Sequence, residues 1–295
     1  MSPARIGSDG LRVRINGEWG EQKLSFLDHY APLALKATEA KYRRYYVDLF
    51  AGPGLNQVSR TSREFEGSPL RAISFTAAGE RTLRFTDVYL VNLDLNDHAA
   101  LDTRVNSRCA DGRAVVPRDH IHCMSGDANQ QIRPILDSIN PLSYVLAFAD
   151  MEAPKQCHWS TIQDLCKYRN HQSVDLYVLF PLSMALRRLV SRNPETVEQA
   201  APTLDTFYGD DRWRPVLEHR RTDSRADTQA VGRELLHLYV DRLRECWRYV
   251  DVICDVRRGS SHQLYKMIFA SNSKAGEKIA KWAKRRSGDQ GDLGL

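Results

Sequence analysis

Short apolar runs alternate with helical segments along the first 180 residues, and this alternation constrains the fold more than any other feature. Strands are expected over residues 45–50, 88–93, 120–124, 144–148 and 174–180. Apolar residues recur at helical spacing in residues 24–42, 68–78, 96–105, 128–139 and 160–168. Because helices connect successive strands, the pattern predicts an α/β protein with a parallel sheet that is covered on both faces.

The alternation stops after residue 181. Residues 182–248 contain no convincing strand, and residues 231–247 have strong helical periodicity, so we expect a helical insertion there. Two further strands and a basic helix are expected over residues 249–256, 263–270 and 274–286. The chain therefore divides into an N-terminal extension (1–22), a core (23–181), the insertion (182–248), the final strands and basic helix (249–287) and a flexible tail (288–295). We also expect the first ten residues to be frayed.

The segment D-L-F-A-G-P-G, residues 48–54, ends the first expected strand. Strand interiors tolerate glycine and proline poorly, so the strand is expected to end near Phe50 and to be followed by a tight turn. Gly52 and Gly54 have no Cβ, which lets the backbone there approach a ligand closely. The dinucleotide fingerprint G-x-G-x-x-G is not met, because Gln57 occupies its third glycine position. The sequence also lacks the phosphate-loop pattern G-x-x-x-x-G-K-[ST].

An acidic residue lies in or just after each of the first four expected strands. These residues are Asp48, Asp94, Asp127 and Asp150. A single such aspartate commonly caps a helix or forms a turn, but four beside a glycine turn favour ligand binding outside the carboxyl ends of the strands. A carboxylate after the second strand can accept hydrogen bonds from both ribose hydroxyls, and the acid after the third can meet an adenine edge. This pattern fits S-adenosylmethionine better than NAD or ATP.

Four segments, in chain order, resemble the three-Cys-motif partner family. They are D-L-F-A-G-P-G, G-S-P-L-R-A, S-G-D-A-N and L-Y-K-M-I-F-A-S-N-S-K-A-G, and the likeness runs over residues 23–282. The resemblance implies a Rossmann-like class I methyltransferase sheet, mostly parallel with seven strands, and a helical insertion before the last two strands. It also implies a cysteine-motif protein as partner and S-adenosylmethionine as cofactor.

The resemblance also implies which residues hold the cofactor. Lys23 and Tyr30 fall on the helix before the first strand and are expected to border the cofactor. The expected cofactor-binding residues are Asp48, Phe50, Ala51, Gly52, Gly54, Asp94, Leu95, Asp127 and Ala128.

The stretch after the fourth strand departs from related sequences. Methyltransferases that modify exocyclic amines carry an acid-proline-aromatic turn here, whereas Asp150 is followed by Met151, Glu152 and Ala153. We identify Asp150 or Glu152 as the group that orients or deprotonates a methyl acceptor, and Trp159 as a candidate pocket wall.

Two classes of function therefore stay open. The first hypothesis is an S-adenosylmethionine-dependent methyltransferase of unknown acceptor. The alternative is a catalytically silent methyltransferase-like scaffold, or a nucleic-acid-binding partner protein in a phage or defence-type system.

The net charge of +5 permits a polyanionic partner without requiring one. Basic residues recur at helical spacing in the final helix and gather in the insertion, so a nucleic-acid surface is the prediction to weigh against a solvated face. These residues are Lys274, Lys278, Lys281, Lys284, Arg285 and Arg286, with Arg187, Arg188, Arg192, Arg212, Arg214, Arg220 and Arg221.

Composition also bears on the compartment. No apolar run approaches the length of a membrane span, and residues 1–9 lack the apolar core of a signal peptide. The six cysteines never form C-x-x-C, which favours reduced thiols in a cytoplasmic protein without membrane contact. His120 and His122 alternate beside Cys123, but this pattern does not supply a closed four-ligand site, so no metal is expected.

Overall fold

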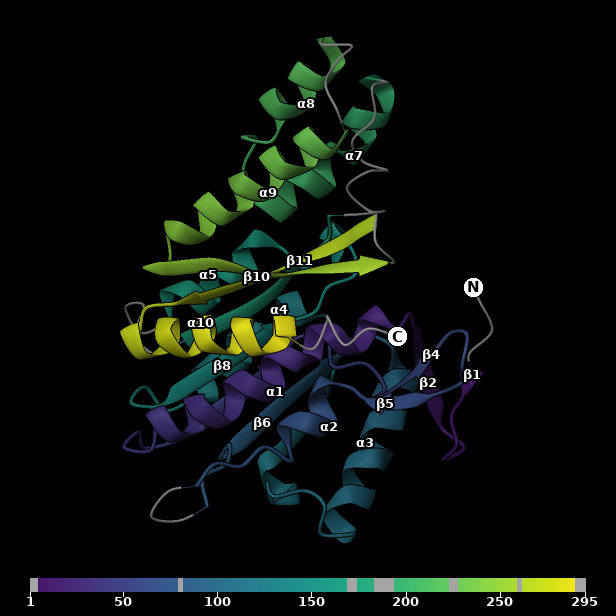
Figure 1. Cartoon of the computed structure of the whole chain (residues 1–295), viewed down its shortest axis with the longest axis vertical. Coiled ribbons are helices and arrows are strands. Elements are labelled where there is room, and N and C mark those ends of the chain that lie inside the picture. The colour runs from purple at the N-terminus through teal and green to yellow at the C-terminus, as the bar shows by residue number, and fades with distance from the viewer. Residues whose placement is uncertain are drawn as a thin grey trace.

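A seven-stranded mixed sheet forms the centre of the protein (Figure 1). The computed structural model describes residues 5–78, 82–168, 174–182, 194–222, 228–258 and 262–289. In spatial order the strands are β10 (Tyr249–Arg258), β11 (His262–Ser271), β9 (Val174–Phe180), β8 (Tyr144–Ala149), β3 (Arg44–Asp48), β6 (Asp87–Asn92) and β7 (Ile121–Ser125). The last five pair in parallel, whereas β11 is antiparallel to both β9 and β10. The expected α/β class is confirmed.

Helices cover both faces of this sheet. One face packs against α1 (Trp19–Ala37), α2 (Ser68–Ala72), α3 (Leu95–Ala110) and α10 (Lys274–Asp289). The other packs against α4 (Ala128–Ser138), α5 (Trp159–Lys167), α7 (Pro194–Tyr208) and α9 (Thr228–Arg244), and α8 (Arg214–Thr222) packs on α9. Side chains alternate across each strand. On β3, Tyr45 and Val47 therefore enter one core and Tyr46 the other.

A second, smaller sheet was not predicted from the sequence. Its strand order is β1 (Arg5–Ile6), β2 (Arg12–Asn16), β4 (Leu55–Val58) and β5 (Glu64–Glu66). It joins the N-terminal extension to the segment that follows the glycine turn, and β2 runs parallel to β4. Buried apolar side chains at Val13, Val58 and Phe65 support it. Figure 1 shows this sheet beside α3, close to the N-terminal end of the described chain.

A buried arginine ties the N-terminal extension to the rest of the protein. The Arg104 guanidinium donates to Asp9 through Nε at 2.7 Å, and its Nη1 donates to the carbonyl oxygens of Arg12 and Pro53 at 2.8 and 2.6 Å. Hydrogen bonds to charged groups are among the stronger ones, particularly where the donor is shielded from water. The prediction that the first ten residues are frayed is therefore wrong for residues 5–10.

Most predicted elements are present, with boundary shifts. The strand predicted over residues 174–180 begins and ends as expected, but the helix predicted over residues 68–78 ends at Ala72. Gly67 is the N-cap of that helix, and the hydroxyl of Ser68, its first residue, bonds Asp48. The helical insertion is confirmed where it is described, in α7, α8 and α9. The turn at residues 259–261 and the tail from residue 290 lie outside the described residues.

The described residues bear on the predictions about membrane spans and cysteines. No helix that they form is both long enough and apolar enough to cross a membrane. Among the described residues, Cys109, Cys123, Cys157, Cys166 and Cys246 form no disulfide.

Candidate functional site

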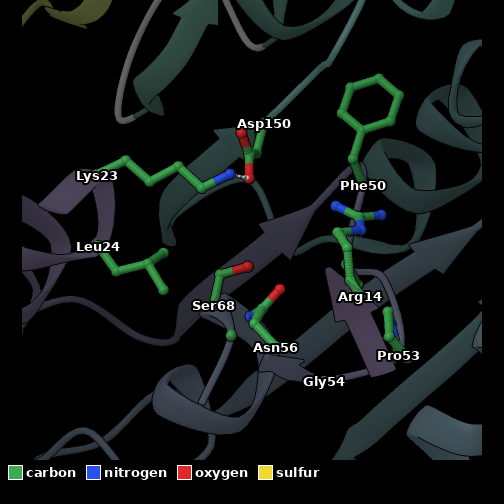
Figure 2. A pocket seen from close by; sticks show the side chains of 11 residues that line it. Arg14, Lys23, Leu24, Phe50, Pro53, Gly54, Asn56, Ser68 and Asp150 are labelled. Atoms are coloured by element: carbon green, nitrogen blue, oxygen red, sulfur yellow. Dashed lines mark hydrogen bonds and ion pairs between the residues drawn. The ribbon is translucent and has the colours of Figure 1, made fainter. Parts of the chain in front are cut away.

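The carboxyl end of β3 lies where the order of the strands reverses. Asp48 pairs with Leu90 of β6 on one side and with Phe148 of β8 on the other. The chain continues from β3 to β6 and reaches β8 only later, so this is the switch point at which open parallel sheets bind ligands. The glycine turn and Asp150 meet here with Lys23 of α1 and with Arg14 of β2 (Figure 2).

The glycine turn has the conformation that its sequence predicts. Gly52 and Gly54 have φ values of 63° and 87°, in the left-handed region that favours glycine. A Cβ on Gly52 would lie 2.9 Å from Arg14 Nη2, and one on Gly54 would lie 2.9 Å from Leu101 Cδ1. The Asn92 side chain donates to the Gly52 carbonyl oxygen at 2.9 Å. The close approach at Gly52 is thus made by a side chain of the N-terminal extension.

Lys23 and Asp150 form a buried ion pair, which the sequence did not predict. Each residue is 6% exposed, and the Lys23 ammonium donates to Asp150 Oδ2 (Figure 2). Asp150 Oδ1 has no hydrogen-bond partner among the described residues. A buried carboxylate oxygen without a donor is unfavourable unless a ligand supplies one. Asp150 therefore has one fixed oxygen and one that is available to a ligand.

Asp48 is fully buried next to this pair. It accepts hydrogen bonds from the Tyr46 hydroxyl at 3.3 Å, from the Phe50 N–H at 3.2 Å and from Ser68. Burial raises the pKa of Asp48 to about 7, although the bonds from Ser68 and Phe50 act in the opposite direction. The charge of nearby Asp150 raises it further. Asp48 therefore exchanges its proton near neutral pH.

Asp94 is half-exposed and caps α3. Its Oδ1 accepts from the backbone N–H groups of Asn96 at 2.8 Å and Asp97 at 3.1 Å. Those backbone donors and the Arg12 guanidinium, 3.2 Å away, lower the pKa of Asp94. Arg12 also pairs with Asp97 at 3.0 Å. Asp94 lies at the predicted strand end, but part of its hydrogen-bonding capacity is used within the protein.

Asp127, Ala128 and Ala51 also lie at the carboxyl edge of the sheet, and their polar groups or side chains are engaged within the protein. Asp127 caps α4, where its Oδ1 accepts from the N–H and the side-chain amide of Asn129 at 2.9 and 2.8 Å. Ala128 is buried in the first turn of that helix, and the Ala51 N–H donates to the Val91 carbonyl oxygen at 3.0 Å. Asp127 and Ala128 lie at the predicted edge of the sheet, but they do not line the cavity around Asp150.

Other predicted residues take different positions. Leu95 is largely exposed at the start of α3, and Phe50 is half-buried at the rim of the cavity (Figure 2). Glu152 is exposed and forms an ion pair with Arg14, with 3.9 Å between Oε1 and Nη1.

Trp159 and Tyr30 do not line the cavity around Asp150. The prediction of Trp159 as a pocket wall is therefore wrong, whereas the expectation that Tyr30 borders a cofactor stays a prediction. Trp159 is 2% exposed and packs edge-on against Tyr239 in the core, because the apolar face of α5 turns it away from Asp150. Tyr30 lies near the amino ends of β8 and β9, where its hydroxyl donates to Asp175.

A different aromatic residue lies near Asp150. Tyr265 is on β11, and burial raises its pKa to about 12, with the charges of Glu152 and Asp150 adding to the effect. That influence places the phenol close to both acids. Tyr265, Phe50 and Tyr46, whose hydroxyl donates to Asp48, are thus among the aromatic side chains near the candidate reaction centre. Tyr265 could not be assigned to this site from the sequence, because β11 joins it from the far end of the chain.

The cavity itself is small. Its volume is about 10 Å³, enough for roughly one water molecule. The Arg14 side chain extends into this space beside Phe50, opposite the Lys23–Asp150 pair (Figure 2). The lining residues are Arg14, Lys23, Leu24, Phe50, Ala51, Pro53, Gly54, Asn56, Gly67, Ser68 and Asp150. A larger ligand would have to displace the partly exposed side chain of Arg14.

His120, just before β7, and His122 of β7 both lie near the carboxylate of Asp87. His120 Nδ1 lies 2.8 Å from Asp87 Oδ1, and His122 Nε2 lies 3.8 Å from the same atom. Burial alone would raise the pKa of Asp87, but the hydrogen bonds from His122 and His120 outweigh it and lower that pKa. Within the described residues, no group of three or more His, Cys, Asp or Glu side chains is arranged to hold a metal ion.

The predicted basic surface is partly neutralised by neighbouring acids. Lys274 and Lys281 both pair with Glu277 at 2.6 Å, and Arg212 and Arg214 pair with acids of the insertion. Arg187, Arg188 and Arg192 lie outside the described residues. A nucleic-acid surface stays a prediction.

Comparison with known proteins adds little to this geometry. No family model and no curated protein matches the sequence. A solved structure of a protein from Legionella pneumophila strain Philadelphia 1, described by the family model DUF519, is similar at a TM-score of 0.48 and 12% sequence identity. The match covers 92% of this chain and 91% of that protein. This similarity is too low to support an argument, and the resemblance to the three-Cys-motif partner family stays a prediction.

Proposed function

We propose that the protein is a class I, S-adenosylmethionine-dependent methyltransferase of unknown acceptor. The observation that carries the proposal is that the glycine turn, the cap acid Asp94 and the half-paired Asp150 follow the carboxyl ends of three adjacent parallel strands, β3, β6 and β8, at one switch point. Strand order supports it. When the strands of the large sheet are numbered along the chain from β3, their spatial order is 3-2-1-4-5-7-6, with an antiparallel final hairpin, which is typical of this class.

The residues present fit such a cofactor. The left-handed glycines leave a backbone surface that no Cβ covers, and Asp94 has a second oxygen for ribose hydroxyls. When bound, the cofactor would supply an electrophilic methyl group on a sulfonium. Methyl transfer requires mainly that donor and acceptor be aligned.

The Lys23–Asp150 pair suggests how the chain would orient an acceptor. Lys23 holds Oδ2, so the carboxylate has a fixed direction and Oδ1 is left to accept a hydrogen bond from an acceptor N–H or O–H. Phe50 and Tyr265 would limit where a flat acceptor can lie.

Binding of S-adenosylhomocysteine, measured by titration calorimetry, tests the cofactor. The wild type is expected to bind, and Asp94→Asn is expected to weaken binding by roughly 5- to 150-fold, the equivalent of about 1–3 kcal/mol for unpaired ribose hydroxyls. Asparagine caps helices about as well as aspartate, so the fold is retained. The control Asp111→Asn changes an exposed acid at the other end of α3. Failure of the wild type to bind would refute the proposal.

Transfer of labelled methyl groups from S-adenosylmethionine to fractionated cell extract tests catalysis. Asp150→Asn is expected to lower transfer by roughly two orders of magnitude or more, with cofactor affinity changed only a few-fold. Asp175→Asn alters a buried acid outside the site and serves as the matched control. If Asp150→Asn keeps its activity, Asp150 serves only as the buried partner of Lys23, and Glu152 becomes the candidate.

A second candidate function is the catalytically silent scaffold. It is favoured by the small cavity, by the internal pairing of Asp150, and by the burial of Met151 where related enzymes have proline. Cofactor binding by a wild type that methylates no acceptor in any fraction would support it.

A further inference from the structure

Strand β2 presents three polar side chains to the cofactor loop. Successive side chains of a strand point to opposite faces, so Arg12, Arg14 and Asn16 share one face. At one end Arg12 pairs with Asp94, and at the other Asn16 donates to the Asn56 side chain at 2.6 Å. Arg14 lies between them.

The backbone fixes the position of Arg14 relative to the glycine turn. β2 pairs in parallel with β4, where Arg14 is opposite Asn56, two residues after Gly54. The buried Arg104 guanidinium joins the same two segments through the carbonyl oxygens of Arg12 and Pro53. The base of the Arg14 side chain is therefore held beside the turn, and only its outer part has freedom to move.

The Arg14 guanidinium lies directly over Gly52. Its Nη2, Cζ and Nε atoms are 2.9, 3.0 and 3.3 Å from the position that a Cβ on Gly52 would take. Its ion pair with Glu152 is 3.9 Å long, which is beyond hydrogen-bond distance. Two neighbouring cations are already engaged, Arg12 with Asp94 and Lys23 with Asp150. A guanidinium has five N–H donors. Of the three cations Arg12, Arg14 and Lys23, Arg14 has the weakest ion pair among the described residues.

We propose that Arg14 binds the carboxylate of the amino-acid group of the cofactor. This inference rests on the proposed function. If Asp94 takes the ribose and Asp150 faces the reacting group, the amino-acid group belongs beside the turn between them. A guanidinium can bind a carboxylate through two parallel hydrogen bonds. Glu152 already places a carboxylate loosely at this guanidinium, and the cofactor would take its place and free Glu152.

Two probes separate this role from general cofactor binding. S-adenosylhomocysteine carries the amino-acid carboxylate, whereas 5′-methylthioadenosine has the same nucleoside without it. By titration calorimetry, Arg14→Gln is expected to weaken S-adenosylhomocysteine roughly 10- to 100-fold and to leave methylthioadenosine within about twofold. Arg60→Gln, at an exposed turn of the same small sheet, is the matched control and is expected to change neither. Circular dichroism and thermal unfolding establish that both variants fold.

The outcomes distinguish the two proposals. Equal weakening of both probes, or of neither, would overturn the assignment of Arg14 and leave the proposed function standing. If the wild type binds neither probe, both the proposed function and the role of Arg14 are overturned. Selective loss of the carboxylate-bearing probe supports both.

Discussion

The two ends of the large sheet each bury an aspartate, but they treat it differently. At the amino end, Asp175 of β9 accepts hydrogen bonds from the hydroxyls of Tyr30, Tyr144 and Ser271. At the carboxyl end, Asp150 is held by Lys23 through one oxygen, and its other oxygen has no partner among the described residues. Helix α1 supplies a donor to both, because Lys23 and Tyr30 lie about two turns apart on it.

The difference shows that saturation of the acid, rather than the size of the cavity, marks the candidate site. The cavity lined by Tyr30, Tyr144 and Asp175 has a volume of about 290 Å³, far more than the roughly 10 Å³ beside Asp150. Three hydroxyl donors nevertheless satisfy Asp175, so it has little left to offer a ligand. A long, partly exposed arginine fills the smaller cavity, and its movement would open that space.

The largest effect is expected when Asp150 loses Lys23, its one ion-pair partner within the described part of the chain. Lys23→Met leaves the buried Asp150 carboxylate without a counterion, and removal of one member of a buried ion pair typically costs about 3–5 kcal/mol. The free energy of unfolding, measured by urea denaturation, should fall by that amount. The double variant Lys23→Met/Asp150→Leu should recover most of the loss, since neither member of the pair then leaves an unpaired buried charge.

The matched control for this prediction lies on the same helix. Lys36→Met breaks an exposed pair with Glu39 and should change stability by less than about 1 kcal/mol. If Lys23→Met lowers the free energy of unfolding no more than this control does, Asp150 does not depend on Lys23. The proposed difference between Asp150 and Asp175 would then be wrong.

The next effect concerns the pH dependence of stability. The pKa of Asp48 is about 7 in the folded protein against 3.8 for the free side chain, because burial disfavours the charged form. Between these values the folded state binds a proton that the unfolded state releases, so stability falls as pH rises towards 7. Asp48 alone should lower the unfolding free energy by about 2 kcal/mol between pH 5.5 and 8.

The isosteric variant isolates this contribution. Asp48→Asn cannot ionise, so the difference in unfolding free energy between variant and wild type should shift in favour of the variant by that amount over the same pH range. Urea denaturation at the two pH values measures it. A difference that does not change with pH would show that the buried acids at this end stay charged throughout.

Local sequence patterns predicted the large sheet well because each of its parallel strands is an apolar run between helices. The small sheet escaped prediction because β2 pairs with β4 across some forty residues, and local periodicity does not encode such a register. The candidate site follows the same rule: its local features were predicted, and its long-range contacts were not. The glycine turn and the strand-end acids are visible in single segments, whereas the Lys23–Asp150 pair joins residues 127 positions apart.

Trp159 illustrates a different failure. It was chosen because it follows Asp150 closely in the sequence, but Asp150 ends a strand and Trp159 begins a helix whose apolar face packs into the core. The closeness of Trp159 to Asp150 in the sequence did not show which way the Trp159 side chain points, because a turn separates the strand from the helix. Arg14 was missed because it lies far from Asp150 in the sequence, on a strand that was not predicted.

The smallest effect tests whether the two ends are independent. Tyr30→Phe removes one of the three hydroxyl donors of Asp175 and should lower the unfolding free energy by about 1 kcal/mol. Affinity for S-adenosylhomocysteine should stay within about twofold of the wild type, because Tyr30 lies at the amino end, whereas Lys23 and Leu24 bring α1 to the cavity at the carboxyl end. Tyr144→Phe, which removes a second donor without altering α1, is the control. A loss of affinity in Tyr30→Phe but not in Tyr144→Phe would mean that α1 transmits changes from the saturated acid to the half-paired one.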